Sequence, residues 1–286
     1  MTARLVIGLS YGAGFALLAV GWTLLVGAAK LVNFAHGQLF MLGAYGTWLG
    51  VNGFDLPILA AAPFGVALAA AAGAVMQLFM LRVTKKQDLV ALMLVTLGFS
   101  YFIEGAAAAL FGEQPRLLRS GLTATSFSLG DGRVRIIDLM LVCSALLVFL
   151  VVWLGVHKTT FGVQLRAVAE DPALSEIYGI RANPIYVTVF ALSGVGAGLA
   201  GALFAAQRTL LPSMGFQEMI LTFAVVATGG VGAIWGNLAA ALALGLFISF
   251  FGGFVSSAYA LPAAFGLILL LLTLRPGGFG RVGEVA

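Results

Sequence analysis

The stretch "LVIGLSYGAGFALLAVGWTLLVG", residues 5–27, is an uninterrupted apolar run close to the N-terminus. It contains no charged residue, and a helix of about 20 apolar residues is long enough to span the hydrocarbon core of a bilayer. The apolar region of a signal peptide has only about 7–15 residues. We therefore expect this run to be a first membrane span that is retained in the mature protein.

The composition of the whole chain agrees with this expectation. Of the 286 residues, 61% are hydrophobic and 9% are charged, whereas soluble domains have about 25% charged residues. The polar residues are too few to coat a soluble core of this length, but lipid solvates apolar surface directly. The net charge of +4 comes from a few residues between apolar runs, so a nucleic-acid-binding function has little support.

Nine apolar runs follow one another along the chain. Each should be helical, because unpaired backbone groups are costly in hydrocarbon. The runs are 5–27, 34–50, 57–81, 89–111, 136–156, 185–206, 218–235, 237–255 and 259–274. Two of them, 34–50 and 218–235, are short, and the second contains Gly229, Gly230 and Gly232, so either could be re-entrant or discontinuous. We predict an all-α polytopic transmembrane bundle, one domain over residues 1–286, with about eight crossings and nine as the alternative.

Positive charges in the loops give a weak signal for sidedness. If all nine runs cross and the C-terminal tail is cytoplasmic, that side receives nine of the 15 Lys and Arg residues. They are Lys30, Arg82, Lys85, Lys86, Lys158, Arg166, Arg181, Arg275 and Arg281, and they include all the lysines. Because cytoplasmic loops are enriched in Lys and Arg, we expect the loop 157–183 to be cytoplasmic and the loop 112–135 to lie outside.

The segment "TTFGVQLRAVAEDPALSEIYGI", residues 159–180, interrupts the apolar pattern with charged residues. Apolar residues recur at helical spacing on one face of each half: Phe161, Leu165 and Val168 in the first, Leu174, Ile177 and Tyr178 in the second. Asp171 and Pro172 favour a helix start, and Gly179 favours a helix end. We predict two short amphipathic helices, and the pattern alone fits a membrane-surface connector and a docking element for a soluble partner equally well.

Four segments carry a resemblance to a known family. They are "NFAHGQLFMLGAYG" (33–46), the segment 159–180, "ATGGVGAIWG" (227–236) and "LRPGGFG" (274–280). Together they resemble the permease subunits of branched-chain amino acid ABC importers, most closely the H-type permeases of the hydrophobic amino acid uptake family. The four matches keep the order of the family and extend over nearly the whole chain.

The resemblance implies a role for the loop 157–183, which is similar to the coupling loop that inserts into a groove of the ATPase subunit. The spacing around Ala169, Glu170, Ala173 and Gly179 is looser than the family consensus. The contact residues implied by the resemblance are polar (Arg166, Glu170, Asp171 and Glu176) and apolar (Phe161, Leu165 and Leu174).

The resemblance also implies partners. These are a second permease, homologous or identical, two ATPase subunits, and a periplasmic or lipid-anchored binding protein at a bacterial inner membrane. The chain lacks the G-x-x-x-x-G-K-[ST] phosphate-binding motif, so ATP and Mg²⁺ should bind the partner ATPase and no cofactor is expected in this chain. The implied substrates are branched-chain or other hydrophobic amino acids, with urea, short amides or aromatic acids as alternatives.

Polar residues within the apolar runs are candidates for the substrate path. Glu104 is the most informative, since a charge at the centre of a span costs about 2.5–3.5 kcal/mol and needs a partner, a water-filled cavity or a position near the membrane edge. It could line the translocation cavity and meet a substrate ammonium group. Gln77 and Thr96 are weaker candidates. Asn33 could cap a helix that begins at the cytoplasmic edge, and His36 could line the path or form a structural hydrogen bond between two helices.

Two alternative function classes remain at this point. An ion-coupled secondary transporter usually carries intramembrane carboxylates, of which Glu104 is the only convincing one. An intramembrane hydrolase would use Ser10 in the G-x-S-x-G match at residues 8–12, but that motif needs a strand-to-helix turn and here lies in an apolar run.

Other motifs are better explained by helix packing. The G-x-G-x-x-G match at 196–201 follows no strand, so a dinucleotide site is not expected. Gly194, Gly198 and Ala202 instead form a ridge of small residues that lets helices approach closely. With two separated histidines and one cysteine, no metal-ligand cluster is expected either.

Overall fold

The computed structural model of the chain describes residues 1–83, 89–118, 125–129, 132–275 and 278. Nine helices in this part of the chain correspond to the nine apolar runs: α1 Thr2–Ala29, α2 His36–Gly53, α3 Ile58–Val83, α4 Leu89–Phe111, α6 Ile136–Lys158, α9 Ala182–Phe204, α10 Met214–Gly229, α11 Ile234–Phe254 and α12 Ala260–Leu274. Two short helices, α7 Thr160–Glu170 and α8 Pro172–Ile177, follow α6, and a 3-10 turn at Ser257–Tyr259 precedes α12. An antiparallel hairpin, β1 Ser126–Leu129 and β2 Gly132–Arg135, lies between α4 and α6.

Seven segments of the described chain are long and apolar enough to cross a membrane. They are α1, α3, α4, α6, α9, α11 and the segment Ser257–Leu274 that contains α12. The runs 34–50 and 218–235, which could be re-entrant or discontinuous, correspond to α2 and α10. Neither helix is long and apolar enough to count as a membrane span, because α2 is less apolar and α10 is shorter. The prediction of a polytopic helical bundle with short helices is confirmed, and the hairpin is an addition to it.

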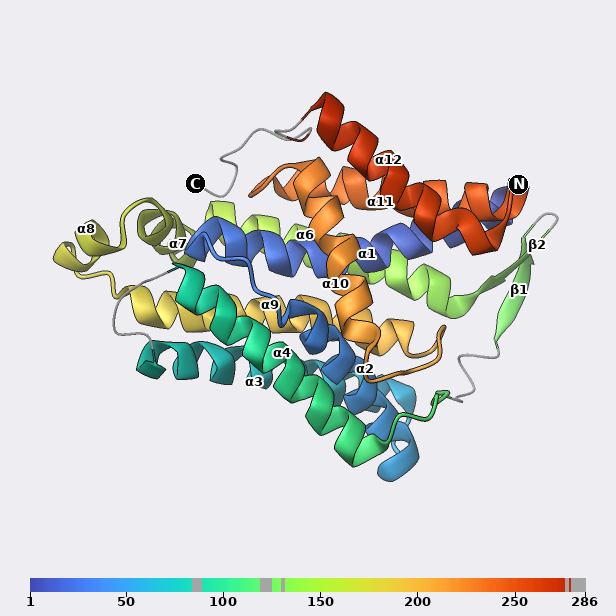
Figure 1. Cartoon of the computed structure of the whole chain (residues 1–286), viewed down its shortest axis with the longest axis horizontal. Helices are drawn as coiled ribbons and strands as arrows, with labels where there is room; N and C mark the ends of the chain where they lie inside the picture. The colour runs from blue at the N-terminus through green and yellow to red at the C-terminus, as the bar shows by residue number, and fades with distance from the viewer. Residues whose placement is uncertain (84–88, 119–124, 130–131, 276–277, 279–286) are drawn as a thin grey trace.

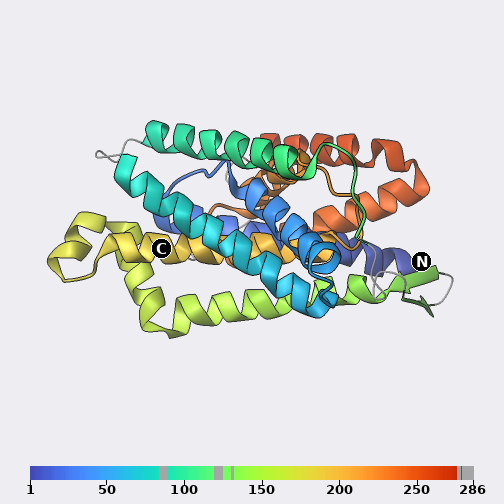
Figure 2. The same ribbon diagram turned by 90° about the horizontal axis from the view of Figure 1, so that it is seen from below.

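Long helices such as α1, α6 and α9 run between two ends of the molecule, and α10 crosses them (Figure 1). Helices α7 and α8 lie at one end, and the β1–β2 hairpin and the N-terminus lie at the other (Figure 1). Figure 2 shows the same arrangement from a perpendicular direction. The loop 157–183 and the described part of the loop 112–135 are therefore on opposite sides of the bundle, as the sequence predicts.

Helix α9 occupies the centre and contacts α1, α2 and α3. Its G-x-G-x-x-G glycines face different neighbours, with Gly196 against α1, Gly198 against α3 and Gly201 against α2. A Cβ added at Gly198 would lie 2.7 Å from the Cβ of Ala69. The prediction that this motif serves helix packing is confirmed.

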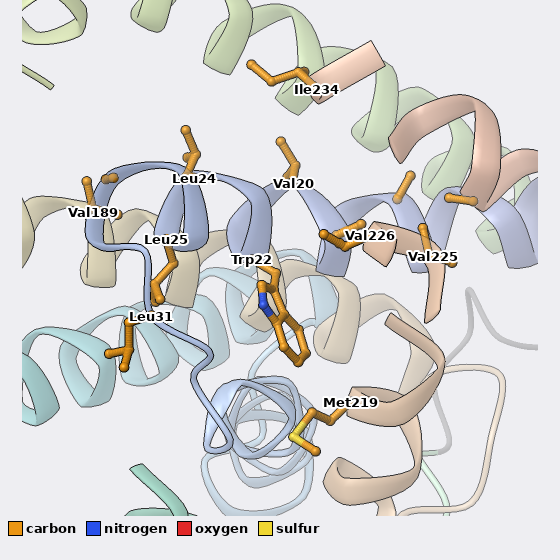
Figure 3. Packing of buried hydrophobic residues seen from close by; sticks show 14 of the residues in the cluster. Val20, Trp22, Leu24, Leu25, Leu31, Val189, Met219, Val225, Val226 and Ile234 are labelled. Atoms are coloured by element: carbon orange, nitrogen blue, oxygen red, sulfur yellow. The ribbon is translucent and has the colours of Figure 1, made fainter. Parts of the chain in front are cut away.

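The largest apolar cluster surrounds α1 (Figure 3). Trp22 is almost fully buried, and it points from α1 toward Met219 of α10 (Figure 3). Val189 of α9 and Ile234 of α11 join the same cluster. The core therefore joins α1 to helices from both halves of the chain.

Helix α10 ends at Gly229, so the predicted run 218–235 is not one continuous helix. Gly230 and Gly232 have φ angles of 104° and 81°, which glycine adopts at little cost and which end an α-helix. The chain turns here, and α11 begins at Ile234. Gly278 packs on this break, since a Cβ added there would lie 2.8 Å from the carbonyl oxygen of Ala227.

Helix α2 also begins differently from the prediction. Its N-cap is Ala35, not Asn33, and the helix does not begin at the edge of the bundle. His36, its first residue, contacts Leu18 near the middle of α1 and Ser193 near the middle of α9. The chain leaves α1 at Lys30 and returns into the bundle as a non-helical segment, residues 31–35, before α2 begins.

Candidate functional site

In the non-helical segment 31–35, two backbone N–H groups bond to side chains inside the bundle. Leu31, Asn33 and Ala35 are buried. The N–H of Phe34 donates to the Oγ1 of Thr96 on α4 over 3.1 Å, and the N–H of Ala35 donates to the Oδ1 of Asn33 over 2.9 Å. Irregular backbone at membrane depth is tolerated only where protein groups or water supply such partners. Asn33 and Thr96 therefore stabilise the break before α2.

His36 connects two central helices. One ring nitrogen lies 3.0 Å from the carbonyl oxygen of Leu18, and the other lies 3.0 Å from the hydroxyl of Ser193. The side chain is completely buried. Of the two predicted roles for His36, this geometry matches the structural one, in which the histidine forms hydrogen bonds to two neighbouring helices.

Ser10 does not contact either histidine through a hydrogen bond in the described structure. Its hydroxyl donates to Asp138 Oδ1 over 3.1 Å, and the side-chain amide of Gln207 donates to the same oxygen over 2.9 Å. His157 contacts the carbonyl oxygen of Trp153 instead. The arrangement is a buried polar network that connects α1, α6 and the end of α9, and it lacks the serine–histidine pair of a hydrolase.

Glu104 lies half-buried on α4 and accepts a hydrogen bond from the side-chain amide of Gln38 on α2 over 3.1 Å. The same amide nitrogen lies 3.3 Å from the hydroxyl of Ser100. The sequence analysis did not select Gln38. The available signal was its position in the matched segment 33–46, two residues after His36.

A groove runs beside Glu104. One pocket, of 550 Å³, is lined by Tyr101, Glu104 and Glu113 together with residues of the loop that precedes α10. A second, of 520 Å³, is lined by apolar residues of α4 and α10 and by Trp22. Tyr101 lines both pockets, so they adjoin each other, and we call the two together the groove along α4 and α10.

Gln77 lies elsewhere. It is buried on α3 and lines a separate pocket of 160 Å³ with Tyr186 and residues of α4 and α9. Of the five predicted path residues, Glu104 alone lines the groove along α4 and α10. The structure places Asn33, His36 and Thr96 in the helix break and its surroundings instead.

The loop after α6 folds as predicted into two short helices. Asp171 separates them and caps α8, its Oδ1 accepting from the N–H groups of Ala173 and Leu174 over 2.9 and 3.0 Å. Gly179 has a φ of 83°. Arg166 donates from its guanidinium to the carbonyl oxygen of Val156, which holds α7 against the end of α6.

One face of α7 is buried in the bundle, and this corrects part of the predicted contact set. Leu165 is 0% exposed and belongs to the main apolar core, and Phe161 packs against that core. Leu165 has no exposed surface to offer a partner, whereas Phe161 is partly exposed and stays a predicted contact residue. The helical spacing of Phe161 and Leu165 marks the face of α7 that packs against α1, α6 and α9.

The opposite side of α7 and α8 carries large exposed apolar residues. Ile177 and Tyr178 are 80% and 78% exposed, and Val163 and Leu174 are also exposed. Glu170, Asp171 and Glu176 are exposed beside them. We call Val163, Leu174, Ile177 and Tyr178 the α7–α8 surface. The sequence analysis placed Ile177 and Tyr178 on one face with Leu174 but did not include them among the contact residues.

The comparison with protein families decides the assignment. Residues 4–274 match the family described as branched-chain amino acid transport system / permease component. The chain belongs to this family. Its helices, the break before α2 and the α7–α8 surface are therefore features of a membrane permease subunit.

Individual relatives extend over almost the whole chain of this permease. It is 27% identical to the high-affinity branched-chain amino acid transport system permease protein BraD of Pseudomonas aeruginosa, covering 96% of this chain and 94% of the relative. It is 24% identical to LivH of Escherichia coli K12, with 95% and 92% covered. The match to LivM of the same organism has 28% identity but covers 67% of that protein, in agreement with the resemblance to the H-type.

A solved structure shares the fold. A metal-chelate type ABC transporter in an inward-facing conformation superimposes with a TM-score of 0.56 and 18% identity, covering 96% of this chain and 85% of that one. At this identity the likeness concerns the fold alone. It agrees with a helical bundle of the ABC transporter type.

The helix break of this permease gives a first testable expectation. Thr96→Val removes the acceptor of the Phe34 N–H, and a buried donor without a partner costs about 1–3 kcal/mol. We expect a lower thermal unfolding midpoint in detergent. Thr188→Val is the matched control, because the Thr188 hydroxyl contacts only its own helix and is exposed; an equal loss in both variants would contradict this role of Thr96.

Proposed function

We propose that this chain forms one half of the translocation pathway of an ABC importer in a bacterial inner membrane. A second permease, homologous or identical, completes the pathway, and two separate ATPase subunits drive it. A binding protein outside the membrane delivers the substrate. The observation that carries this proposal is the α7–α8 surface, which presents large apolar side chains beyond the ends of the membrane-spanning helices (Figure 1).

The α7–α8 surface has the composition of a protein contact. Ile177 and Tyr178 are exposed side by side, with Glu170 and Glu176 nearby as polar residues at the rim. Aromatic and apolar anchors surrounded by polar residues are typical of binding hot spots. Because the buried side of α7 is part of the core, a force applied to the exposed side passes directly to α1, α6 and α9.

The sidedness of the proposal follows from the positive charges. Helix α1 ends at Ala29 just before Lys30, α3 ends next to Arg82, and α6 ends at Lys158. These helix ends lie toward the same end of the molecule as α7 and α8 (Figure 1). The positive-inside rule therefore supports a cytoplasmic location for the loop 157–183, and by the same alternation for the C-terminus.

The groove along α4 and α10 is the proposed part of the pathway. Much of α4 is exposed in the isolated chain, yet it carries Glu104 within its apolar run. A carboxylate facing hydrocarbon is costly, so charged residues in spans face protein or a water-filled cavity. We infer that the second permease covers this groove and that Glu104 faces the enclosed space.

The proposed substrates are branched-chain or other hydrophobic amino acids, because the relatives BraD and LivH are named as branched-chain amino acid permeases. Urea, short amides and aromatic acids remain the alternatives. The chain acts as a transport subunit without catalytic residues of its own. ATP and Mg²⁺ bind the partner ATPases in this proposal, since the sequence has no phosphate-binding motif of the Walker type.

The docking part of the proposal is tested by Ile177→Asp combined with Tyr178→Asp. Loss of central anchors costs about 2 kcal/mol or more, so the affinity for the ATPase should fall at least about 30-fold. Co-purification of the ATPase and ATP-driven amino acid uptake into proteoliposomes are the measurements. Phe127→Asp is the matched control, because Phe127 is an exposed aromatic residue on the hairpin at the opposite end.

The two variants separate the possible results. If the ATPase remains bound and transport continues in the double variant, the α7–α8 surface is not the docking site. If Phe127→Asp loses the ATPase to the same extent, the effect is not specific to the α7–α8 surface. A complex that assembles normally but transports no amino acid would contradict the proposed substrate class.

A further inference from the structure

A small cavity lies where α9 ends and α10 begins. It has a volume of 140 Å³, and its apolar walls include Phe40 of α2, Phe204 of α9, Leu210 and Met214. A buried water needs about 10–15 Å³, so the cavity has room for more than a single water. Leu211 and Ser213 line both this cavity and the Glu104 pocket, so the cavity is a neighbour of the groove along α4 and α10.

Two opposite charges meet at this cavity. Arg208 Nη1 lies 2.6 Å from Glu218 Oε1, and both residues line the cavity. The Glu218 side chain is 6% exposed, whereas that of Arg208 is 38% exposed. The guanidinium lies over the rings of Tyr11 and Phe204 at 5.3 and 4.9 Å from their centroids, so it is held in place while part of it remains accessible.

The carboxylate of Glu218 is only half satisfied. Its Oε2 is buried and has no hydrogen-bond partner among the described residues. A buried charged oxygen without a partner is costly in a low-dielectric interior. In an ion pair with a purely structural role, we would expect this oxygen to accept a hydrogen bond as well.

The second ion pair of the described chain provides the comparison. Asp138 Oδ1 accepts from Ser10, Gln207 and the guanidinium of Arg135, and Oδ2 accepts from the backbone and side chain of Arg135. Both oxygens are therefore occupied, as in a pair with a structural role. The Arg208–Glu218 pair differs in having a free oxygen and a neighbouring cavity.

The arrangement matches one chemical class of ligand. A zwitterionic α-amino acid presents a carboxylate to Arg208 and an ammonium group to the carboxylate of Glu218, which lines the cavity, while its apolar side chain contacts walls such as Phe40 and Phe204. The first turn of α10 adds a secondary attraction for the carboxylate, since its N-cap Ser213 makes no side-chain capping bond and helix N-termini favour anions.

The alternative substrates fit less well. Urea and short amides carry no charge for Arg208 or Glu218 to recognise. An aromatic acid without an ammonium group would place a second anion next to Glu218, and like charges repel strongly where the dielectric is low. The pair thus discriminates in favour of ligands that carry both charges.

We propose that Arg208 and Glu218 form an amino-acid binding site on the transport pathway, in which each charge of the pair recognises the opposite charge of a zwitterionic substrate with an apolar side chain. The inference rests on the proposed transport function. It places a substrate-binding site inside the permease, so that the permease as well as the external binding protein selects the substrate.

The test is direct binding of radiolabelled L-leucine to the assembled transporter in nanodiscs, without the binding protein and without ATP. We expect saturable leucine binding to the unchanged transporter. The affinity for leucine should be at least tenfold weaker in Arg208→Gln and in Glu218→Gln. Arg116→Gln should bind as the unchanged protein does, because the Arg116 side chain lies over Trp48, donates to the Phe111 carbonyl oxygen and does not line the cavity. Leucinamide, which lacks the carboxylate, and 4-methylpentanoate, which lacks the ammonium group, should not compete.

A folding control accompanies these variants. The double variant Arg208→Gln, Glu218→Gln leaves no unpaired charge, so it should elute as a monodisperse complex and still fail to bind leucine. Leucine binding that persists in this double variant would overturn the proposal, as would competition by either single-charge analogue. Absence of leucine binding in the unchanged transporter while ATP-driven leucine uptake proceeds would overturn the site but leave the proposed function standing; absence of uptake of any amino acid would instead count against the proposed function.

Discussion

Gly43→Ala is expected to prevent the chain from accumulating as a folded, monodisperse protein. Gly43 of α2 lies between Gly198 of α9 and Gly65 of α3, and a Cβ added to it would lie 2.5 Å from the Cα of Gly198. Overpacking a core costs about 1–3 kcal/mol, occasionally more. The cost here should exceed this range, because the obstructing atoms are backbone and cannot rotate away.

The measurement is fluorescence-detected size-exclusion chromatography of the detergent-solubilised protein, followed by thermal unfolding. Gly155→Ala in α6 is the matched control, since a Cβ there would meet no atom within 4 Å and alanine favours a helix more than glycine does. We expect this control to be neutral or slightly stabilising. A Gly43→Ala protein that is as stable as the control would show that α2, α3 and α9 do not pack in this way.

The second large effect is expected for Asp138→Ala. The change removes the carboxylate that accepts hydrogen bonds from Ser10, Arg135 and Gln207, and it leaves the Ser10 hydroxyl as an acceptor for Gln207. Removing one partner of a buried ion pair costs about 3–5 kcal/mol, and we expect the lower part of this range because the Arg135 side chain is 33% exposed. The result should be a lower unfolding midpoint and a loosened contact between α6 and α1.

Ser10→Ala provides the graded comparison. It removes the hydrogen bond from Ser10 to Asp138 and the longer one from Gln207 to Ser10, and each bond should contribute about 0.5–1.5 kcal/mol. Transport should be retained in this variant, whereas a hydrolase that uses Ser10 as nucleophile would lose all activity. An Asp138→Ala protein no less stable than Ser10→Ala would show that the network does not hold α1 and α6 together.

Several features could be predicted from sequence because they depend on neighbours along the chain. Length and apolarity of each run identify the spans, and Asp171 before Pro172 identifies the junction of α7 and α8. The glycines at 229, 230 and 232 indicated an interrupted helix, although the predicted boundaries 218–235 joined two helices across that interruption. Local rules for helix caps and helix-breaking residues predict that a helix is interrupted at such positions. They do not specify on which side of a group of glycines the helix ends.

Contacts between distant segments explain the predictions that were wrong. Asn33 fits a helix cap in sequence, yet α2 begins inside the bundle because His36 bonds to Leu18 and Ser193. The spacing of Phe161 and Leu165 predicts an apolar face correctly, but periodicity does not tell whether that face contacts a partner or the core of the same chain. The 0% exposure of Leu165 shows that this residue faces the core of the same chain.

The Arg208–Glu218 site has a sequence signal that is visible only in retrospect. The cation Arg208 precedes the apolar run 218–235 by ten residues, and the anion Glu218 is the first residue of that run. Ordinary charges at the membrane interface show the same pattern. The cavity, the 2.6 Å contact and the free oxygen arise from the turn between α9 and α10 and from Phe40 of α2.

Hydrophobic burial in lipid and helix capping act over a few neighbouring residues, so the order of amino acids is enough to identify a membrane bundle, its helices and the bend of the α7–α8 loop. The side of α7 that is buried, the amide that meets Glu104 and the two charges that share a cavity became known from the folded chain. Those features depend on close approach between helices that are far apart in sequence, and such approach is set by the packing of the whole bundle.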